Sequence, residues 1–162
     1  MNNKSIIIMG VAGCGKTTIG SLVSKQTRSY FIEGDDFHSK ENIKKMSSGI
    51  PLNDSDRMGW LKSIKNETSK RLIQNNVIIA CSALKQIYRK KLQLDNSILI
   101  YLKISKNDAQ NRLSERKDHF MPSSLVQSQF KILEEPSSAL IYDATTNIDD
   151  IVNDICKKIN LR

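Results

Sequence analysis

The feature that most constrains the fold is a glycine-rich octapeptide that follows a short apolar run. The run is Ser5–Met9, and the octapeptide matches G-x-x-x-x-G-K-[ST] without a gap as Gly10-Val11-Ala12-Gly13-Cys14-Gly15-Lys16-Thr17. Apolar residues then recur at helical spacing. A strand–loop–helix setting for this pattern is typical of a phosphate-binding loop, in which glycines turn the backbone and the helix N-terminus attracts anions. The octapeptide, with Thr18 after it, therefore predicts a nucleoside-triphosphate site.

Two side chains of this phosphate loop (residues 10–17) have predicted roles of their own. Lys16 is expected to bridge the β- and γ-phosphates of ATP, and the hydroxyl of Thr17 is expected to bind Mg²⁺. Cys14 is interpreted as a packing residue.

Strands and helices are predicted to alternate along the rest of the chain. Helices are expected after Ser39, from about residue 54 to residue 73, from Ser105 to about Lys117, after residues 122–124, and over Ile148–Ile159. Further strands are expected at Tyr30–Ile32, Val77–Cys81, Ile98–Ile104 and Leu140–Tyr142. This alternation implies an α/β fold with a five-stranded parallel sheet covered by helices on both faces. A chain of 162 residues is expected to form one domain.

Composition and charge exclude several classes of protein. The net charge is +8, but the Lys and Arg residues are scattered, which predicts a cationic surface that attracts small anions and not a nucleic-acid interface. The longest apolar run is Ile6–Gly13, too short to span a membrane. The three cysteines lack metal-ligand or disulfide spacing, which suits a reducing compartment. A lipoprotein-like signal ending at Cys14 would be cleaved inside the phosphate loop, so a cytoplasmic location is expected.

The absence of two sequence motifs excludes two classes of nucleotide-binding protein. No predicted strand ends in the aspartate of a motor or transporter ATPase, and no N-K-x-D motif follows as in a GTPase. A small kinase that phosphorylates a small acceptor remains. Asp35 could accept the proton of the acceptor hydroxyl or orient water on Mg²⁺. Arg112 and Arg116, one helical turn apart, suit a lid at about residues 112–124 that neutralises the transferring phosphoryl group.

Several blocks of residues, spread along nearly the whole chain, form a specific pattern. They are Asp35-Asp36-Phe37-His38, Asn42-Ile43-Lys44-Lys45-Met46, Gly49-Ile50-Pro51-Leu52-Asn53-Asp54-Ser55-Asp56-Arg57 with Trp60-Leu61, Cys81-Ser82-Ala83-Leu84-Lys85 with Tyr88-Arg89, Arg112-Leu113 through Arg116, His119-Phe120, Gln129-Phe130, and Leu133-Glu134-Glu135-Pro136. Together these blocks resemble the gluconokinase family, and the D-D-x-H and P-L-N-D-x-D-R blocks are the most specific to it.

The resemblance implies ATP-dependent phosphorylation of the 6-hydroxyl of D-gluconate, with Mg²⁺, in an adenylate-kinase-like fold with a mobile lid, as a homodimer. It makes Asp35 the expected base, with Asp36 and His38 beside it in the acceptor region. It also makes three cations candidates for holding the sugar acid, namely Arg57, Lys85 and Arg89. Arginine suits this task because its guanidinium offers a carboxylate two parallel hydrogen bonds.

The chain departs from the family pattern at three positions. Glu33 replaces the usual aspartate, which puts the role of that carboxylate toward Mg²⁺ in question. Gly59 replaces a proline, which is expected to loosen a helix start, and Asp118 replaces a glycine in the lid.

Three further residues or segments have expectations of their own. His119 is not expected to bind metal, and Trp60 is expected in the core. Residues 145–147 are expected near the adenine.

Two alternatives stay open from the residues. The first is a kinase for another hydroxyl acceptor, such as shikimate or a nucleoside monophosphate. The second is a non-catalytic module whose partner surface is switched by ATP.

Overall fold

The computed structural model describes residues 2–116, 122 and 124–161. Five strands and seven α-helices alternate along these residues, with one 3₁₀-helix, η1 (Gly34–Phe37). The strands are β1 (Ser5–Met9), β2 (Tyr30–Glu33), β3 (Val77–Ala80), β4 (Ile98–Lys103) and β5 (Leu140–Asp143). The helices are α1 (Lys16–Thr27), α2 (Lys40–Ser47), α3 (Asp54–Arg71), α4 (Gln86–Leu92), α5 (Lys106–Ser114), α6 (Leu125–Ile132) and α7 (Ile148–Ile159).

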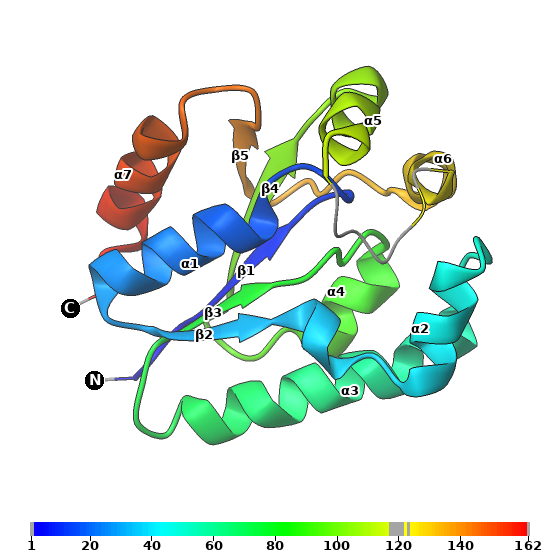
Figure 1. Cartoon of the computed structure of the whole chain (residues 1–162). Helices are drawn as coiled ribbons and strands as arrows, with labels where there is room; N and C mark the ends of the chain where they lie inside the picture. Colours follow the sequence, from blue (N-terminus) through cyan, green and yellow to red (C-terminus); the bar gives the residue numbers. More distant parts are fainter. Residues whose placement is uncertain (1, 117–121, 123, 162) are drawn as a thin grey trace.

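All five strands form one parallel sheet in the order β2-β3-β1-β4-β5. The central strand β1 pairs with β3 on one side and β4 on the other, so that Ile7 lies between Ile79 and Leu99. Because the strands are parallel, their carboxyl ends meet at one edge, which is where open α/β sheets bind ligands. The phosphate loop leaves the middle of this edge, and α2, α5 and α6 surround it (Figure 1).

Helices cover both faces of the sheet, as the sequence predicts. In Figure 1, α1 and α7 lie side by side on one face and α3 and α4 cover the other. Side chains along β1 point alternately to the two faces of the sheet. Ile6 and Ile8 join the apolar cluster under α1 and α7, whereas Ile7 and Met9 join the cluster under α3. All four are fully buried. Burial of each such side chain contributes roughly 1.5–3 kcal/mol, so β1 anchors the phosphate loop firmly.

The predicted strands agree with the observed ones within one residue, but three helix predictions were wrong. Helix α4 was missed, because its seven residues are rich in cations and no regular apolar stripe marks it. Helix α3 ends at Arg71, and Ile73, expected on its apolar stripe, is 79% exposed. Helix α5 ends at Ser114 and not near residue 117. Gly59 lies inside α3, so it does not affect the helix start.

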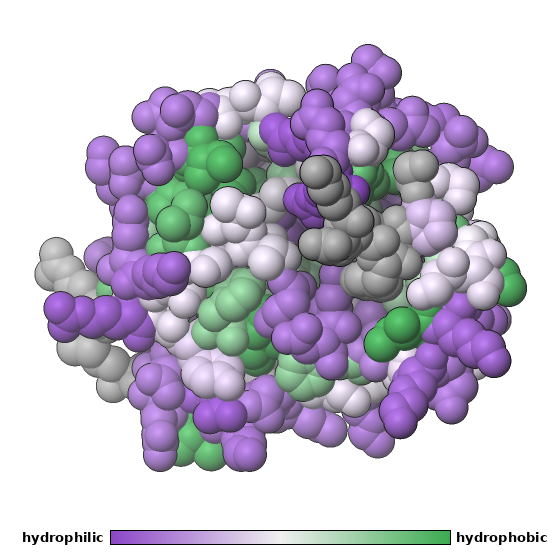
Figure 2. Space-filling model, in the orientation of Figure 1, coloured by the Kyte–Doolittle hydropathy of each residue, from purple (hydrophilic) through white to green (hydrophobic). Residues whose placement is uncertain are grey.

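The face of the molecule drawn in Figure 2 is mainly hydrophilic. Figure 2 shows hydrophobic residues on this face as separate patches among hydrophilic ones. None of the helices in the described ranges is long and apolar enough to cross a membrane.

Candidate active site

The phosphate loop has the backbone that its glycines predict. Gly10, Gly13 and Gly15 have φ angles of 154°, 87° and 97°, which L-residues rarely adopt. A Cβ atom at Gly10 would also lie 2.6 Å from the Sγ atom of Cys14 and 2.8 Å from the carbonyl oxygen of Leu102. Glycine is therefore required at Gly10 for two independent reasons, and Cys14, which is 1% exposed, packs beneath the loop.

Hydrogen bonds within the loop and from neighbouring elements hold it in this shape. The Nζ atom of Lys16 donates to the carbonyl oxygen of Val11 at 3.1 Å. The amide of Ala12 donates to Oε1 of Gln129, on α6, at 2.7 Å, and this bond is buried. The amide of Gly10 donates to the carbonyl oxygen of Ser82, which follows β3, at 3.3 Å. The loop is thus attached to both β3 and α6.

The acidic segment after β2 reaches the phosphate loop through Glu33. The hydroxyl of Thr17 donates to the Glu33 carboxylate, which also accepts from the amide of Asp35 at 3.3 Å. Burial raises the pKa of Glu33 above its usual value, against the opposing effect of the Thr17 hydrogen bond. The longer side chain at this departure from the family pattern therefore contacts the predicted Mg²⁺ ligand Thr17 directly.

The two aspartates of this segment face different surroundings. Asp35 lines the cleft beside the phosphate loop. Asp36 lines a separate depression with Phe37 and Glu67, on the outer side of β2. Asp36, a predicted substrate ligand, is therefore not among the residues that line the cleft.

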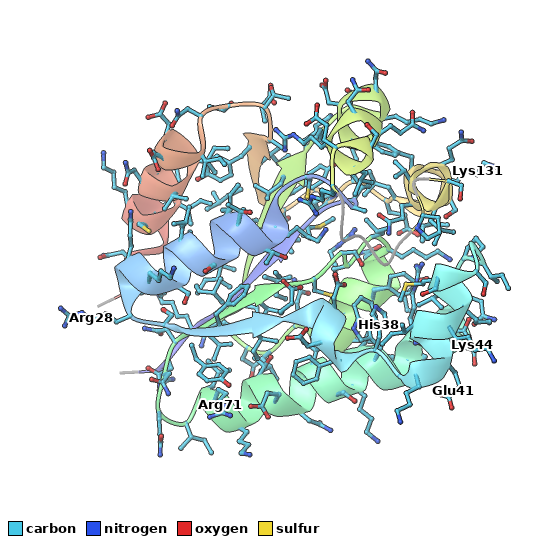
Figure 3. The ribbon with its side chains drawn as sticks, in the orientation of Figure 1. Arg28, His38, Glu41, Lys44, Arg71 and Lys131 are labelled. Atoms are coloured by element: carbon cyan, nitrogen blue, oxygen red, sulfur yellow. The ribbon has the colours of Figure 1, made fainter. Side chains whose placement is uncertain are left out.

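His38 is half-buried at the cleft and stacks on Trp60. The ring centroids are 4.1 Å apart and the planes differ by 15°. The indole Nε1 of Trp60 donates to the carbonyl oxygen of Gly34 at 2.7 Å. Burial lowers the pKa of His38 to about 4, so the imidazole is neutral at pH 7. Figure 3 shows His38 between η1 and α3, whereas Glu41 and Lys44 point outward from α2.

One cleft joins these groups. The phosphate loop and the start of α1 form one side, and the rest comes from α2, α3 and α6 and from the segments that follow β2, β3, α2 and α5. The lining residues are Ala12, Gly13, Gly15, Lys16, Thr17, Thr18, Asp35, His38, Met46, Leu52, Arg57, Trp60, Ser82, Arg116 and Gln129.

Of the three cations predicted to hold the sugar acid, only Arg57 lines this cleft. Lys85 forms an ion pair with Asp54 at 2.9 Å, outside the lining. Arg89 is 5% exposed, and its guanidinium donates to the carbonyl oxygens of Ala83, Leu84 and Glu134 at 2.8, 3.0 and 2.9 Å. Ala83 has a φ of 45°, so Arg89 stabilises an unfavourable turn after β3, and it is not among the residues that line the cleft.

The two predicted lid arginines also differ. Arg112 donates to the carbonyl oxygen of Ala144 at 2.7 Å and to that of Gly13 at 3.3 Å, so it links the phosphate loop to the segment after β5. Arg116 is exposed and lines the cleft. Part of the predicted lid, including Asp118 and His119, falls on residues 117–121 and 123, which lie outside the described residues.

Sequence reasoning did not select three residues that the structure places at or beside the site. Gln129 holds the phosphate loop, Trp60 combines a core position with a place on the cleft wall, and Tyr88 contacts Arg57. All three stand in the blocks that resemble the family, but no local pattern gave them a role in the site. The partner of each is distant in sequence, and a local pattern does not show such a contact.

The donor set at the phosphate loop fits a nucleotide-bound Mg²⁺ ion. In the described part of the chain, no group of three or more His, Cys, Asp or Glu side chains could hold a metal ion alone. Thr17 and Glu33 supply two adjacent oxygen groups beside Lys16. Mg²⁺ commonly takes one or two such protein groups together with substrate phosphates.

Comparison with known proteins identifies the family. The shikimate kinase family model matches residues 12–160. A probable gluconokinase from Dictyostelium discoideum is 41% identical over 170 residues, which cover 93% of this chain and 83% of that protein. The thermosensitive gluconokinase of Escherichia coli (strain K12) is 43% identical over 143 residues, 85% of this chain and 75% of that protein.

Solved structures agree with the sequence relatives. A gluconokinase from Sinorhizobium meliloti 1021 superposes with a TM-score of 0.84 at 38% identity, over 97% of this chain and 91% of that one. The shikimate kinase from Aquifex aeolicus vf5 has a TM-score of 0.68 at 16% identity, a likeness of fold alone. Since the specific likeness is to gluconokinases and the likeness to shikimate kinase is one of fold, the chain belongs to the gluconokinase family.

Proposed function

We propose that this protein transfers the γ-phosphoryl group of ATP to the 6-hydroxyl of D-gluconate and so forms 6-phosphogluconate. The observation that carries the proposal is the single cleft in which the phosphate loop faces Asp35, His38 and Arg57. Its relatives are named gluconokinases, which supports gluconate as the acceptor. The cleft also supports an enzyme over a binding module switched by ATP, because acceptor-side groups lie next to the phosphate site.

On the nucleotide side, the amides of the phosphate loop and the ammonium of Lys16 bind the phosphates. Arg116, on the cleft wall, moves toward the γ-phosphoryl group and neutralises its charge as the segment at about 112–124 closes as a lid. Arg112 holds the loop to the segment after β5, and we propose that the adenine lies beside this segment. Exclusion of water by closure limits wasteful hydrolysis of ATP.

Thr17 and Glu33 are the groups that would hold Mg²⁺, Thr17 by its hydroxyl and Glu33 from the adjacent position. An ion held by these residues would supply positive charge to offset that of the ATP phosphates. Glu33 also keeps the Thr17 hydroxyl oriented toward the phosphate site.

On the acceptor side, Asp35 accepts a hydrogen bond from the 6-hydroxyl, orients it for attack and takes its proton as the new O–P bond forms. The neutral His38 ring stacks on Trp60 and forms a wall of the acceptor pocket. Arg57 binds the carboxylate of gluconate, which is at the opposite end of the molecule from the 6-hydroxyl.

We further propose that the chain works as one domain, in the cytoplasm, as a homodimer. Unpaired thiols at Cys14, Cys81 and Cys156 support a reducing compartment. The homodimer is inferred from the family resemblance, and sedimentation velocity of the purified protein tests it.

The function is tested by an acceptor screen with ATP and Mg²⁺. Product formation with D-gluconate, shikimate, a nucleoside monophosphate and no acceptor is compared, with 6-phosphogluconate measured through a coupled dehydrogenase. We expect turnover of about 1–100 s⁻¹ with gluconate alone, and a loss of about 10²-fold or more in kcat in Asp35→Asn. ATP binding without transfer to any acceptor would favour the binding module instead.

A further inference from the structure

Arg57, the cation on the acceptor side of the cleft, is held by a tyrosine from another helix. Its Nη1 atom donates to the hydroxyl oxygen of Tyr88, on α4, at 3.0 Å, and its guanidinium carbon lies 5.0 Å from the centre of the Tyr88 ring. Tyr88 is only 2% exposed, so its position is set by packing. A guanidinium carries five N–H donors, and donation of one to Tyr88 leaves a two-donor fork for a carboxylate.

Tyr88 is itself held by an ion pair. Its hydroxyl donates to Oδ1 of Asp54, and the same oxygen accepts from Nζ of Lys85 at 2.9 Å. Asp54 and Arg57 are three residues apart on α3 and therefore share a face of that helix. Tyr88 thus uses its O–H as the donor to Asp54, and its oxygen can accept the hydrogen bond from Arg57. Burial and the Asp54 hydrogen bond raise the pKa of Tyr88, which keeps the hydroxyl protonated in this role.

The charges of this group favour an anion in the cleft. Asp54 offsets the charge of Lys85 through their ion pair, and Arg57 retains its positive charge at the cleft wall. Lys85, a predicted substrate ligand, therefore acts on the acceptor site indirectly, by holding Asp54.

We propose that Tyr88 is a positioning residue for acceptor recognition: with Asp54 and Lys85 it fixes the Arg57 guanidinium so that the fork meets the carboxylate of the sugar acid. This inference rests on the proposed function, because it takes gluconate as the acceptor. Without the Tyr88 hydroxyl, Arg57 would keep its charge and its contact with the ring but lose its fixed orientation, which a bidentate contact needs.

The chain contains a matched control at a distance from the acceptor side. Tyr142, on β5, donates to Asp154 at 2.8 Å, Lys158 pairs with Asp154 at 2.8 Å, and the Lys158 ammonium lies 5.4 Å from the Tyr142 ring centre. This Lys–Asp–Tyr group repeats the arrangement of Lys85, Asp54 and Tyr88, whose ammonium-to-ring distance is 5.7 Å, but it holds no arginine at the cleft.

The test compares Tyr88→Phe with Tyr142→Phe in the gluconate assay. Tyr88→Phe is expected to raise KM for gluconate about tenfold, the loss typical of one hydrogen bond to a charged group. It is expected to leave kcat within about twofold and KM for ATP unchanged, because the carboxylate contact is the same in the ground and transition states. The preference for gluconate over D-glucitol, which has CH₂OH in place of the carboxylate, falls by a similar factor. Tyr142→Phe changes none of these values.

A second set of variants separates positioning from general damage to the fold. In an Arg57→Ala background, Tyr88→Phe should raise KM for gluconate no further, since the two residues act through one contact. Additive effects in the double variant, or an unchanged KM in Tyr88→Phe, would overturn the inference while leaving the proposed function intact. Failure of the wild-type protein to phosphorylate gluconate would overturn both.

Discussion

At the scale of single residues, two glycines show how far the surroundings decide what a residue does. A Cβ atom at Gly34 would lie 2.5 Å from the carbonyl oxygen of Ala80, where the acidic segment crosses β3. A Cβ atom at Gly59, inside α3, would meet nothing within 4 Å. The first glycine allows the close approach that brings Asp35 to the cleft, whereas the second only weakens a helix.

Alanine substitutions at these two positions are expected to have opposite effects. Gly34→Ala should lower the free energy of unfolding by about 2 kcal/mol, because the backbone must move away from β3. Gly59→Ala should raise it by about 0.5–1 kcal/mol, because alanine favours a helix. Urea denaturation measures both. Wild-type stability in Gly34→Ala would mean that this segment can shift without cost.

At the scale of elements, helix α6 and the phosphate loop form a unit that no local pattern reveals. Gln129 is 8% exposed and accepts from the amide of Ala12, although 117 residues separate the two. Met46 and Leu52 on the acceptor side pack with Leu125 at the start of α6 in a small apolar cluster apart from the two sheet cores. Helix α6 therefore contacts both halves of the cleft.

The link between α6 and the loop predicts a specific effect on nucleotide binding. Gln129→Met keeps the length of the side chain but leaves the buried Ala12 amide without its acceptor, which costs about 1–3 kcal/mol. The loop should distort, and Kd for ATP should rise about tenfold in a calorimetric titration. Gln127→Met, at an exposed position on the same helix, is the control. Equal ATP affinity in the two variants would contradict the role given to Gln129.

At the scale of the whole molecule, the parallel sheet collects the site from segments scattered along the chain. Residues after β1, β2 and β3 meet α2, α3 and α6 at one edge. The packing that closes this site also buries His38 against Trp60. The stability of the fold is therefore linked to the protonation of an active-site residue.

This burial predicts how stability depends on pH. The unfolded chain binds a proton at His38 near pH 6.5, whereas the folded chain does so only near pH 4. The contribution of the neutral His38 to the free energy of unfolding is thus complete above pH 6.5 and is lost as the pH falls from 6.5 to 4.

His38→Phe tests this dependence, because phenylalanine keeps the stacking on Trp60 and does not titrate. Its Tm, measured by circular dichroism, should fall less between pH 7 and pH 5 than that of the wild type. Glu33, whose raised pKa acts with the opposite sign, is common to both proteins and cancels in the comparison. Parallel Tm curves would show that His38 does not titrate as described.

The amino-acid sequence by itself determined the features that depend on local pattern. The phosphate loop, the five strands, and the helix starts at Ser39 and Ser105 could be predicted because glycine conformation, apolar periodicity and capping act over a few residues. Only the tertiary structure decided which cations reach the cleft. Arg57, Lys85 and Arg89 are alike as residue types, yet the first lines the cleft, the second pairs with Asp54 and the third binds backbone carbonyls. Their partners lie on other elements, and which partner a side chain meets is settled by packing between distant parts of the chain.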